Sequence, residues 1–122
     1  MPKRMLQDTL DFEISFFEGL VRKDPNFVDA LIPLAEAYTR KKLYAKGLRI
    51  DKRLARLCKD DPVVHYNLAC SLALIGKKDE AFSALRRAIK LGYDDFDYLK
   101  RDSDLRSLRD DPRFKKLVPA EK

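Results

Sequence analysis

The sequence lacks tryptophan and contains few of the residues that commonly interrupt regular structure. Only four glycines and six prolines occur in 122 residues. An all-β fold built from many tight turns would need more of both, so such a fold is not expected. Long apolar runs are also missing, since the longest nearly uncharged stretch is 68–76. A membrane span requires ~18 apolar residues, and we therefore expect no association with a membrane.

Cysteine and histidine are scarce, which limits metal and catalytic chemistry. The two cysteines, Cys58 and Cys70, are too few for a disulfide scaffold and are expected to be reduced. Their spacing with the single histidine, His65, matches no common zinc pattern. Neither a Gly-rich phosphate loop nor a nucleophile motif is present. We expect no metal, no cofactor and no enzymatic activity.

The chain does contain charged and apolar residues in amounts that suit a small folded domain. Hydrophobic residues make up 45% of the sequence and charged residues 38%, with a net charge of +6. A chain of this size can bury one core, so we expect a single domain. The N-terminus begins with basic residues, but Asp8, Asp11 and Glu13 interrupt any signal-like apolar segment. A cytoplasmic location is therefore expected.

The sequence contains an internal repeat. Segments 31–57 and 65–91 align without gaps at a shift of 34, and small residues match small residues while apolar residues match apolar ones. A further shift of 34 matches 10–23 to the second half of each unit. A fixed period of this length is typical of stacked helical units.

Within each unit, apolar residues recur with the period of a helix. Leu31, Leu34, Ala35 and Tyr38 follow the i, i+3, i+4, i+7 spacing of one helix face. Asp-Pro pairs starting at 24, 61 and 111 are typical of helix starts, and Gly76 of a helix end. No strand is expected. We predict helices at 8–23, 26–41, 43–59, 62–75 and 78–91, and shorter ones at 95–101, 103–109 and 112–118.

These residues resemble the tetratricopeptide repeat, a helix-turn-helix unit of about 34 residues. In 62–95, Leu68 and Ala69 supply a Leu-small pair, Gly76 the turn, and Ala81 a small residue of the second helix. The resemblance implies an all-α fold, with antiparallel helix pairs stacked into a right-handed α-solenoid. Members of this family bind proteins or peptides without catalysis.

The other unit, 28–61, matches the family pattern less well, and Lys59 holds the slot of the late proline. Lys42 replaces the turn glycine, and Asp51 stands where an aromatic residue usually packs. The resemblance nevertheless implies one domain, 1–122, with four parts. These are an N-terminal half-repeat or cap at 8–25, repeat units at 28–61 and 62–95, and a C-terminal cap at 96–118.

The tail resembles the ending of many bacterial arrays of this family. The stretch Asp-x-Asp-Leu-x-x-Leu-Arg-x-Asp-Pro-x-Phe begins at Asp102. Terminal caps are needed because the last repeat has an apolar side with no neighbour. The expected covering side chains are Tyr93, Phe96, Leu99, Leu105, Leu108, Phe114 and Leu117 at this end, and Leu10, Ile14, Phe17, Leu20 and Val21 at the other.

The resemblance implies that the first helix of each unit presents a concave face to a peptide or partner helix. The residues at the inward positions are Asp29, Ile32, Glu36, Thr39, Arg40, Val63, Tyr66, Asn67, Cys70 and Ala73, with Asp97, Lys100 and Arg101 extending the face. The alternative is that Ile32 and Tyr66 pack against the caps and leave a groove too short for a ligand. Glu36 would repel a carboxylate, so binding of chaperone C-termini is not expected.

A second hypothesis rests on the uneven distribution of charge. Residues 40–59 carry nine basic residues and one acid, whereas 8–30 carry six acids and two basic residues. The basic patch consists of Lys46, Arg49, Lys52, Arg53 and Arg56 on one helix face. It could bind an acidic protein or, less readily, nucleic acid, because no stacking aromatics are interleaved. The plainer alternative is a solvated helix face.

The two charged regions also allow self-association. In this third hypothesis the acidic N-terminal surface of one chain meets the basic helix of another, which would give a monomer or a weak homodimer.

Overall fold

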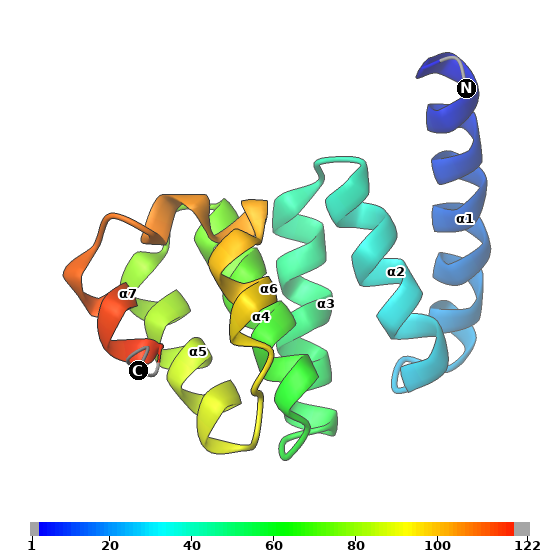
Figure 1. The fold of residues 1–122 in the computed structure, drawn as a ribbon. Coiled ribbons are helices and arrows are strands. Elements are labelled where there is room, and N and C mark those ends of the chain that lie inside the picture. Colours follow the sequence, from blue (N-terminus) through cyan, green and yellow to red (C-terminus); the bar gives the residue numbers. More distant parts are fainter. Residues whose placement is uncertain (1–2, 119–122) are drawn as a thin grey trace. The chain divides into compact units, whose positions relative to one another are not determined.

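The computed structural model describes residues 3–118, with side chains from residue 6 onward. All regular elements in this range are helical, as the periodicity predicts (Figure 1). The chain divides into two compact units, Met1–Leu57 (unit 1) and Cys58–Lys122 (unit 2). Within residues 3–118, no helix has both the length and the apolar character needed to cross a membrane. The division of the chain into two repeat units and two caps is more detailed than this division into two units, and it stays a prediction.

From Lys3 onward, unit 1 consists of three successive helices. They are α1 (Lys3–Lys23), α2 (Val28–Arg40) and α3 (Tyr44–Leu57). The middle helix, α2, packs against both α1 and α3 and runs antiparallel to each (Figure 1). On α1 the apolar side chains of Leu10 and Ile14 are buried, while Phe17, Leu20 and Val21 are half-buried.

Unit 2 is built on one antiparallel helix pair, α4 (Pro62–Leu74) and α5 (Lys78–Lys90) (Figure 1). The rest of the described part of unit 2 is a C-terminal segment with three short elements, which are α6 (Phe96–Arg101), the 3-10 helix η1 (Ser103–Leu108) and α7 (Pro112–Leu117). In this segment, η1 packs on α4 and α7 packs on α5. The expected covering side chains Leu99, Leu105, Leu108 and Phe114 are buried, and Tyr93, Phe96 and Leu117 are half-buried.

Side-chain caps explain the starts of α4, α6, η1 and α7. The predicted bounds agree with the structure within two residues, except that α1 begins at Lys3 rather than at residue 8. As predicted, Asp61 and Asp111 accept hydrogen bonds from the first backbone amides of α4 and α7. The expected helix start at Asp24 is wrong. Asp24 instead accepts from the Asn26 amide within a turn, and α2 begins at Val28 without a side-chain cap.

Three helices end in the same backbone motif. After α4, the amides of Gly76 and Lys77 donate to the carbonyls of Ala73 and Leu72. This is the Schellman pattern, in which one residue adopts a positive φ. Gly76 (φ +83°) and Gly92 (φ +116°) take that position after α4 and α5. After α2 the same position is held by Lys42 (φ +66°).

Paired helices approach each other closely where their side chains are small. A Cβ on Gly47 of α3 would lie 3.1 Å from Oγ1 of Thr39 and 3.6 Å from the carbonyl oxygen of Ala35, both on α2. The repeat places Ala81 at the equivalent position of unit 2, and Ala81 is fully buried. The small residues of the repeat therefore set the distance between the two helices of a pair.

The positive φ of Lys42 leads to a prediction about stability. A side chain with a Cβ is strained in the left-handed region, whereas glycine is not. Because the Lys42 side chain is exposed, Lys42→Gly is expected to raise the free energy of unfolding of unit 1 by about 1 kcal/mol. The reciprocal change Gly76→Lys is expected to lower that of unit 2 by a similar amount. Urea unfolding followed by circular dichroism measures both, and equal effects of the same sign would contradict the assignment.

Candidate functional site

The predicted binding face of α4 is covered by the C-terminal segment. Tyr66 is only 4% exposed, and Cys70 is buried as well. The Tyr66 hydroxyl donates a 2.6 Å hydrogen bond to Oδ2 of Asp102, and Sγ of Cys70 lies 3.6 Å from the same oxygen. The Tyr66 ring also stacks on Tyr93, with ring centroids 4.3 Å apart. The expectation that Tyr66 and Cys70 face an open groove is therefore wrong, and for Tyr66 the alternative of packing against the C-terminal segment holds.

Asp102 is held in place by the local structure on both sides of it. It is the residue that joins α6 to η1, and its Oδ1 accepts from the Asp104 amide and so caps η1. The guanidinium of Arg109 donates to its carbonyl oxygen at 2.5 Å. Leu99 and Leu105 on either side are fully buried. The carboxylate is therefore fixed against α4 by a capped turn between two apolar anchors.

Burial controls the electrostatics of this cluster. It raises the pKa of the Tyr66 hydroxyl and of the Cys70 thiol, and the neighbouring Asp102 carboxylate adds to both effects. Burial also raises the pKa of Asp104. Both the phenol and the thiol therefore stay protonated at neutral pH and act as hydrogen-bond donors. A buried protonated thiol is a weak nucleophile.

Cys70, Asp102 and Asp104 bring one sulfur and two carboxylates within 4.8 Å of one another. Such a set could in principle contact a metal ion. However, Oδ2 of Asp102 already accepts from Tyr66, and its Oδ1 accepts from a backbone amide. These hydrogen bonds hold the C-terminal segment against α4, and we call this contact between Tyr66, Cys70 and Asp102 the Tyr66 closure. The sequence predicts that the chain binds no metal, and this stays a prediction.

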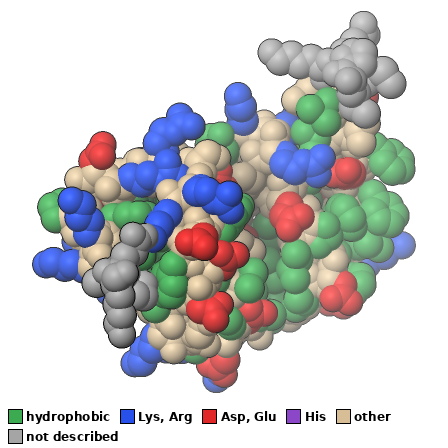
Figure 2. Space-filling view, in the orientation of Figure 1, with side chains coloured by type: hydrophobic (Ala, Val, Ile, Leu, Met, Phe, Trp, Pro, Cys, Tyr) green, Lys and Arg blue, Asp and Glu red, His purple; other side chains and the backbone are tan. Residues whose placement is uncertain are grey.

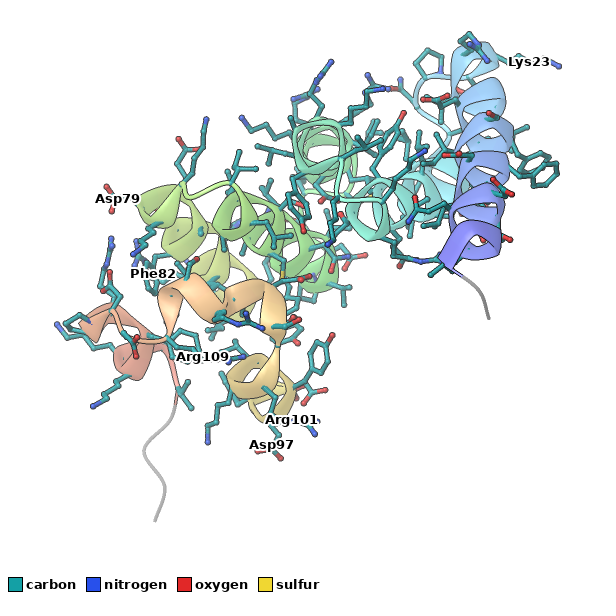
Figure 3. The ribbon with its side chains drawn as sticks, turned by 90° about the horizontal axis from the view of Figure 1, so that it is seen from above. Lys23, Asp79, Phe82, Asp97, Arg101 and Arg109 are labelled. Carbon is teal, nitrogen blue, oxygen red and sulfur yellow. The ribbon has the colours of Figure 1, made fainter. Side chains whose placement is uncertain are left out.

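The remaining predicted residues of unit 2 lie around this closure. Val63 is exposed and Asn67 is half-buried on α4, and Lys100 is half-buried on α6. Arg101 donates to the carbonyl oxygen of Asp97, and Figure 3 shows both on α6. Because Tyr66, Cys70 and Ala73 are buried, the predicted residues of α4 do not form one open face.

The single histidine is engaged with the backbone. Nε2 of His65 lies 2.8 Å from the carbonyl oxygen of Lys59 and therefore donates to it. Cys58 is a half-buried free cysteine. Neither residue belongs to the Cys70 cluster. The imidazole thus stabilises the loop that connects α3 to α4.

In unit 1 the corresponding face of α2 is exposed. Ile32 is 38% exposed, and Asp29, Glu36 and Arg40 are exposed on the same side of the helix. Nη1 of Arg40 pairs with Glu13 of α1 at 3.2 Å. Thr39 is half-buried, because its hydroxyl donates to the carbonyl oxygen of Ala35. The structure therefore brings these predicted residues together on one open helix face.

Several acids of α1 are paired within unit 1. Asp11 pairs with Lys41, and Glu13 pairs with Arg40. The Tyr38 hydroxyl donates to Glu18 at 2.5 Å, and burial together with this bond raises the pKa of Tyr38. These contacts attach α1 to the C-terminal end of α2. They also reduce the acidic surface that the third sequence hypothesis requires.

The basic patch lies along one side of α3. Lys46, Arg49, Lys52 and Arg56 are exposed. The fifth member, Arg53, is half-buried and donates from Nη1 to the carbonyl oxygen of Pro25. Asp51, the one acid of this helix, is buried. Four of the five predicted basic side chains are therefore available to a partner.

Sequence reasoning did not identify the cluster around Arg113. This guanidinium lies over the Phe82 ring, 4.3 Å from its centroid, and pairs with Asp79 and Asp111. Hydrogen bonds from Arg113 lower the pKa of Asp111 to about 2. Figure 3 shows Phe82 inside unit 2 and Asp79 at its edge. Asp79 and Arg113 lie 34 residues apart, beyond the reach of the local patterns that predict the helices.

A hollow of about 360 Å³ lies next to this cluster, between α5 and α7. It combines basic side chains with an apolar floor. The lining residues are Arg86, Ile89, Lys90, Arg113, Lys116 and Leu117. The pair Arg86 and Lys90, one helical turn apart, was its only visible sequence signal.

The Tyr66 closure generates a prediction about stability. Tyr66→Phe removes a donor to a buried carboxylate, which is expected to lower the free energy of unfolding of unit 2 by about 2 kcal/mol. Tyr98→Phe is the control, because Tyr98 is 46% exposed and its ring centroid lies 6.3 Å from that of Tyr66. The control is expected to change stability little. Urea unfolding of both variants makes the comparison, and an unchanged Tyr66→Phe would contradict the closing role.

No family model matches the chain. A segment of 56 residues is 38% identical to part of a protein from Arabidopsis thaliana whose name describes it as chloroplastic. The match covers 46% of this chain and 17% of that protein, so it spans less than a fifth of the relative's length.

Proposed function

We propose that this chain is a non-catalytic protein-interaction module of the tetratricopeptide type, active in the cytoplasm. In this proposal its helix pairs form part of a right-handed α-solenoid. The exposed face of α2 binds a peptide or a partner helix. The internal repeat, the small residues between paired helices and the turn motif after α2, α4 and α5 support the assignment.

One observation carries the proposal. A single repeat shift leads from Ile32 and Glu36 on α2 to Tyr66 and Cys70 on α4, so the two pairs hold equivalent positions. On α4 these positions are buried under a segment of the same chain, which places the Asp102 carboxylate against them. On α2 they are exposed. The face of α4 is thus covered by the turn around Asp102, whereas the equivalent face of α2 is open.

The chemistry of the α2 face defines the ligand. Ile32 offers an apolar contact, and Asp29 and Glu36 stand about two helical turns apart as acids. Pro33 lies on the same side and has no amide, so the carbonyl oxygen of Asp29 lacks its helical donor. A segment with an apolar side chain next to lysine or arginine would satisfy all three features. An acidic segment would be repelled.

This proposal predicts the outcome of a selection from a library of random peptides. Peptides that combine an apolar residue with lysine or arginine are expected to be enriched. Ile32→Asp is expected to weaken their binding about tenfold, because an exposed aliphatic contact contributes about 1–2 kcal/mol. Fluorescence anisotropy with a selected peptide measures the change.

Ile75→Asp is the matched control, because Ile75 is an aliphatic residue of nearly the same exposure in unit 2. It is expected to bind as the unchanged protein does. Enrichment of acidic peptides, or equal losses in both variants, would contradict binding at α2.

The exposure of the basic patch favours a second candidate, binding of an anionic partner by α3. Lys46, Arg49, Lys52 and Arg56 occupy one side of the helix and face solvent. A row of like charges attracts polyanions and releases counterions when it binds them. Such binding depends strongly on salt.

This candidate predicts that a fluorescent single-stranded oligonucleotide or polyglutamate binds at low salt. Arg49→Glu, Lys52→Glu and Arg56→Glu together are expected to abolish it. Arg53 is left unchanged because it holds the Pro25 carbonyl. The control changes Lys77, Lys78 and Arg106 to glutamate, which are exposed residues of unit 2. Equal losses in both triple variants would point to net charge and reject a site on α3.

A further inference from the structure

The outer face of α1 exposes two phenylalanines. Phe12 is 72% exposed and Phe16 is 53% exposed. Figure 2 shows hydrophobic side chains gathered on the outer side of this helix. Leu10 and Ile14, on the opposite face, are buried. Two exposed phenylalanines one turn apart mark an interaction surface more strongly than single exposed apolar residues would.

Phe12 and Phe16 differ from the residues at the equivalent positions of the internal repeat. One repeat shift leads from Phe12 to Lys46 and a second to Glu80, and both of those side chains are exposed and charged. The same two shifts lead from Phe16 to Ile50 and Ala84, each of which is only 8% exposed. Thus α1 has an aromatic residue where the repeat has a solvated charge. It also exposes a position that the repeat buries.

Gly19 lies on the same face in the interior of α1. Glycine in a helix interior lowers helix stability, because it loses more conformational freedom than other residues. Among the residues that the structure describes, a Cβ built at Gly19 would meet nothing within 4 Å. The equivalent residues of the repeat are Arg53 and Arg87. No contact with the described residues therefore requires a glycine at this position, whereas the close approach of a group from outside the chain would.

Asp8 and Lys23 complete this surface at its two ends. The spacings from Asp8 to Phe12, Phe16, Gly19 and Lys23 are four, four, three and four residues, so all five share one side of the helix. Asp8 and Lys23 are exposed. Figure 3 shows Lys23 extending away from α2. The outer face of α1 is therefore acidic at one end, aromatic in the middle and basic at the other end.

We propose that this outer face binds the same face of a second copy, with the two α1 helices antiparallel. In the matching register the two residue numbers at each contact add up to 31. Phe12 then lies opposite Gly19 of the second copy, and Phe16 opposite its Ser15. Asp8 lies opposite Lys23. Each large side chain meets a small one and each acid meets a base, and a two-fold axis repeats every contact.

The charges select this partner and this direction. A parallel pair would place Asp8 beside Asp8 and Lys23 beside Lys23, which is repulsive. Association of α1 with the basic helix α3 of another copy is less favoured, because Asp11 and Glu13 already pair with Lys41 and Arg40. A single 21-residue helix pair buries less surface than a permanent dimer requires, so a dissociation constant on the order of micromolar is expected.

Sedimentation velocity over a range of protein concentrations tests the proposal. The unchanged protein is expected to pass from the mass of one chain to twice that mass. Phe12→Glu is expected to remain monomeric with an unchanged melting temperature at low concentration, because the ring is exposed in the monomer. Gly19→Gln is the sharper variant. It raises the helix stability of the monomer and fills the space opposite Phe12, so it should melt at a higher temperature yet fail to dimerise.

A charge exchange tests the direction of the pair. Asp8→Lys and Lys23→Asp are each expected to weaken the dimer at least about tenfold, since the like charges meet twice. The double variant restores both contacts only in an antiparallel pair, so it is expected to dimerise as the unchanged protein does. A protein that is monomeric at all concentrations would overturn the proposal. So would a dimer that tolerates Phe12→Glu and Gly19→Gln.

Discussion

Close contact between paired helices through small side chains is the constraint on which the rest of the structure depends. Gly47 lets α3 approach α2, and Ala81 and Ala88 of α5 are fully buried in unit 2. When two helices lie this close, each has little room between them for large side chains. The larger apolar residues must therefore pack on adjoining faces, and every such face needs a cover. In unit 2 the chain itself supplies one, because Leu105 and Leu108 of η1 are buried where that helix packs on α4.

The need for covers divides the helix faces into closed and open ones. The closed face of α4 shows what a cover consists of: a capped turn, apolar anchors and one carboxylate, Asp102, that pairs with Tyr66. The equivalent face of α2 and the outer face of α1 have exposed apolar residues instead. Our proposals assign a peptide to the first and a second copy to the other. Both treat binding as the completion of packing that the repeat begins.

Local patterns were sufficient to predict the helices and many of the buried residues. The helical period of Leu31, Leu34 and Ala35 depends only on which side of a helix is apolar. The caps at Asp61 and Asp111 depend on residues next to them. Asp24 misled the prediction because an Asp-Pro pair also suits a turn, and here its carboxylate binds the amide two residues on.

Contacts between distant segments were harder to predict. The positions of Tyr66 and Cys70 indicate a common face, but their cover comes from Asp102, which lies far along the chain from both. Periodicity carries no information on which segment returns to a face. The stacking of Arg113 on Phe82 was missed for the same reason. Lys42 is a different case. The sequence already showed that a lysine replaces the turn glycine there, but only the backbone of the structure shows that this lysine has a positive φ.

The stacked tyrosines of unit 2 have a spectroscopic consequence. The sequence has no tryptophan and five tyrosines, so tyrosine dominates its near-ultraviolet absorption and its emission. Tyr66 and Tyr93 lie face to face with an interplanar angle of 4°, and the Tyr66 hydroxyl is bonded to a carboxylate. Coupled transitions in this ring pair are expected to give unit 2 a near-ultraviolet circular dichroism signal of its own. We expect the carboxylate to quench the emission of Tyr66 only while the C-terminal segment is in place, which would make this tyrosine an intrinsic optical reporter of that segment.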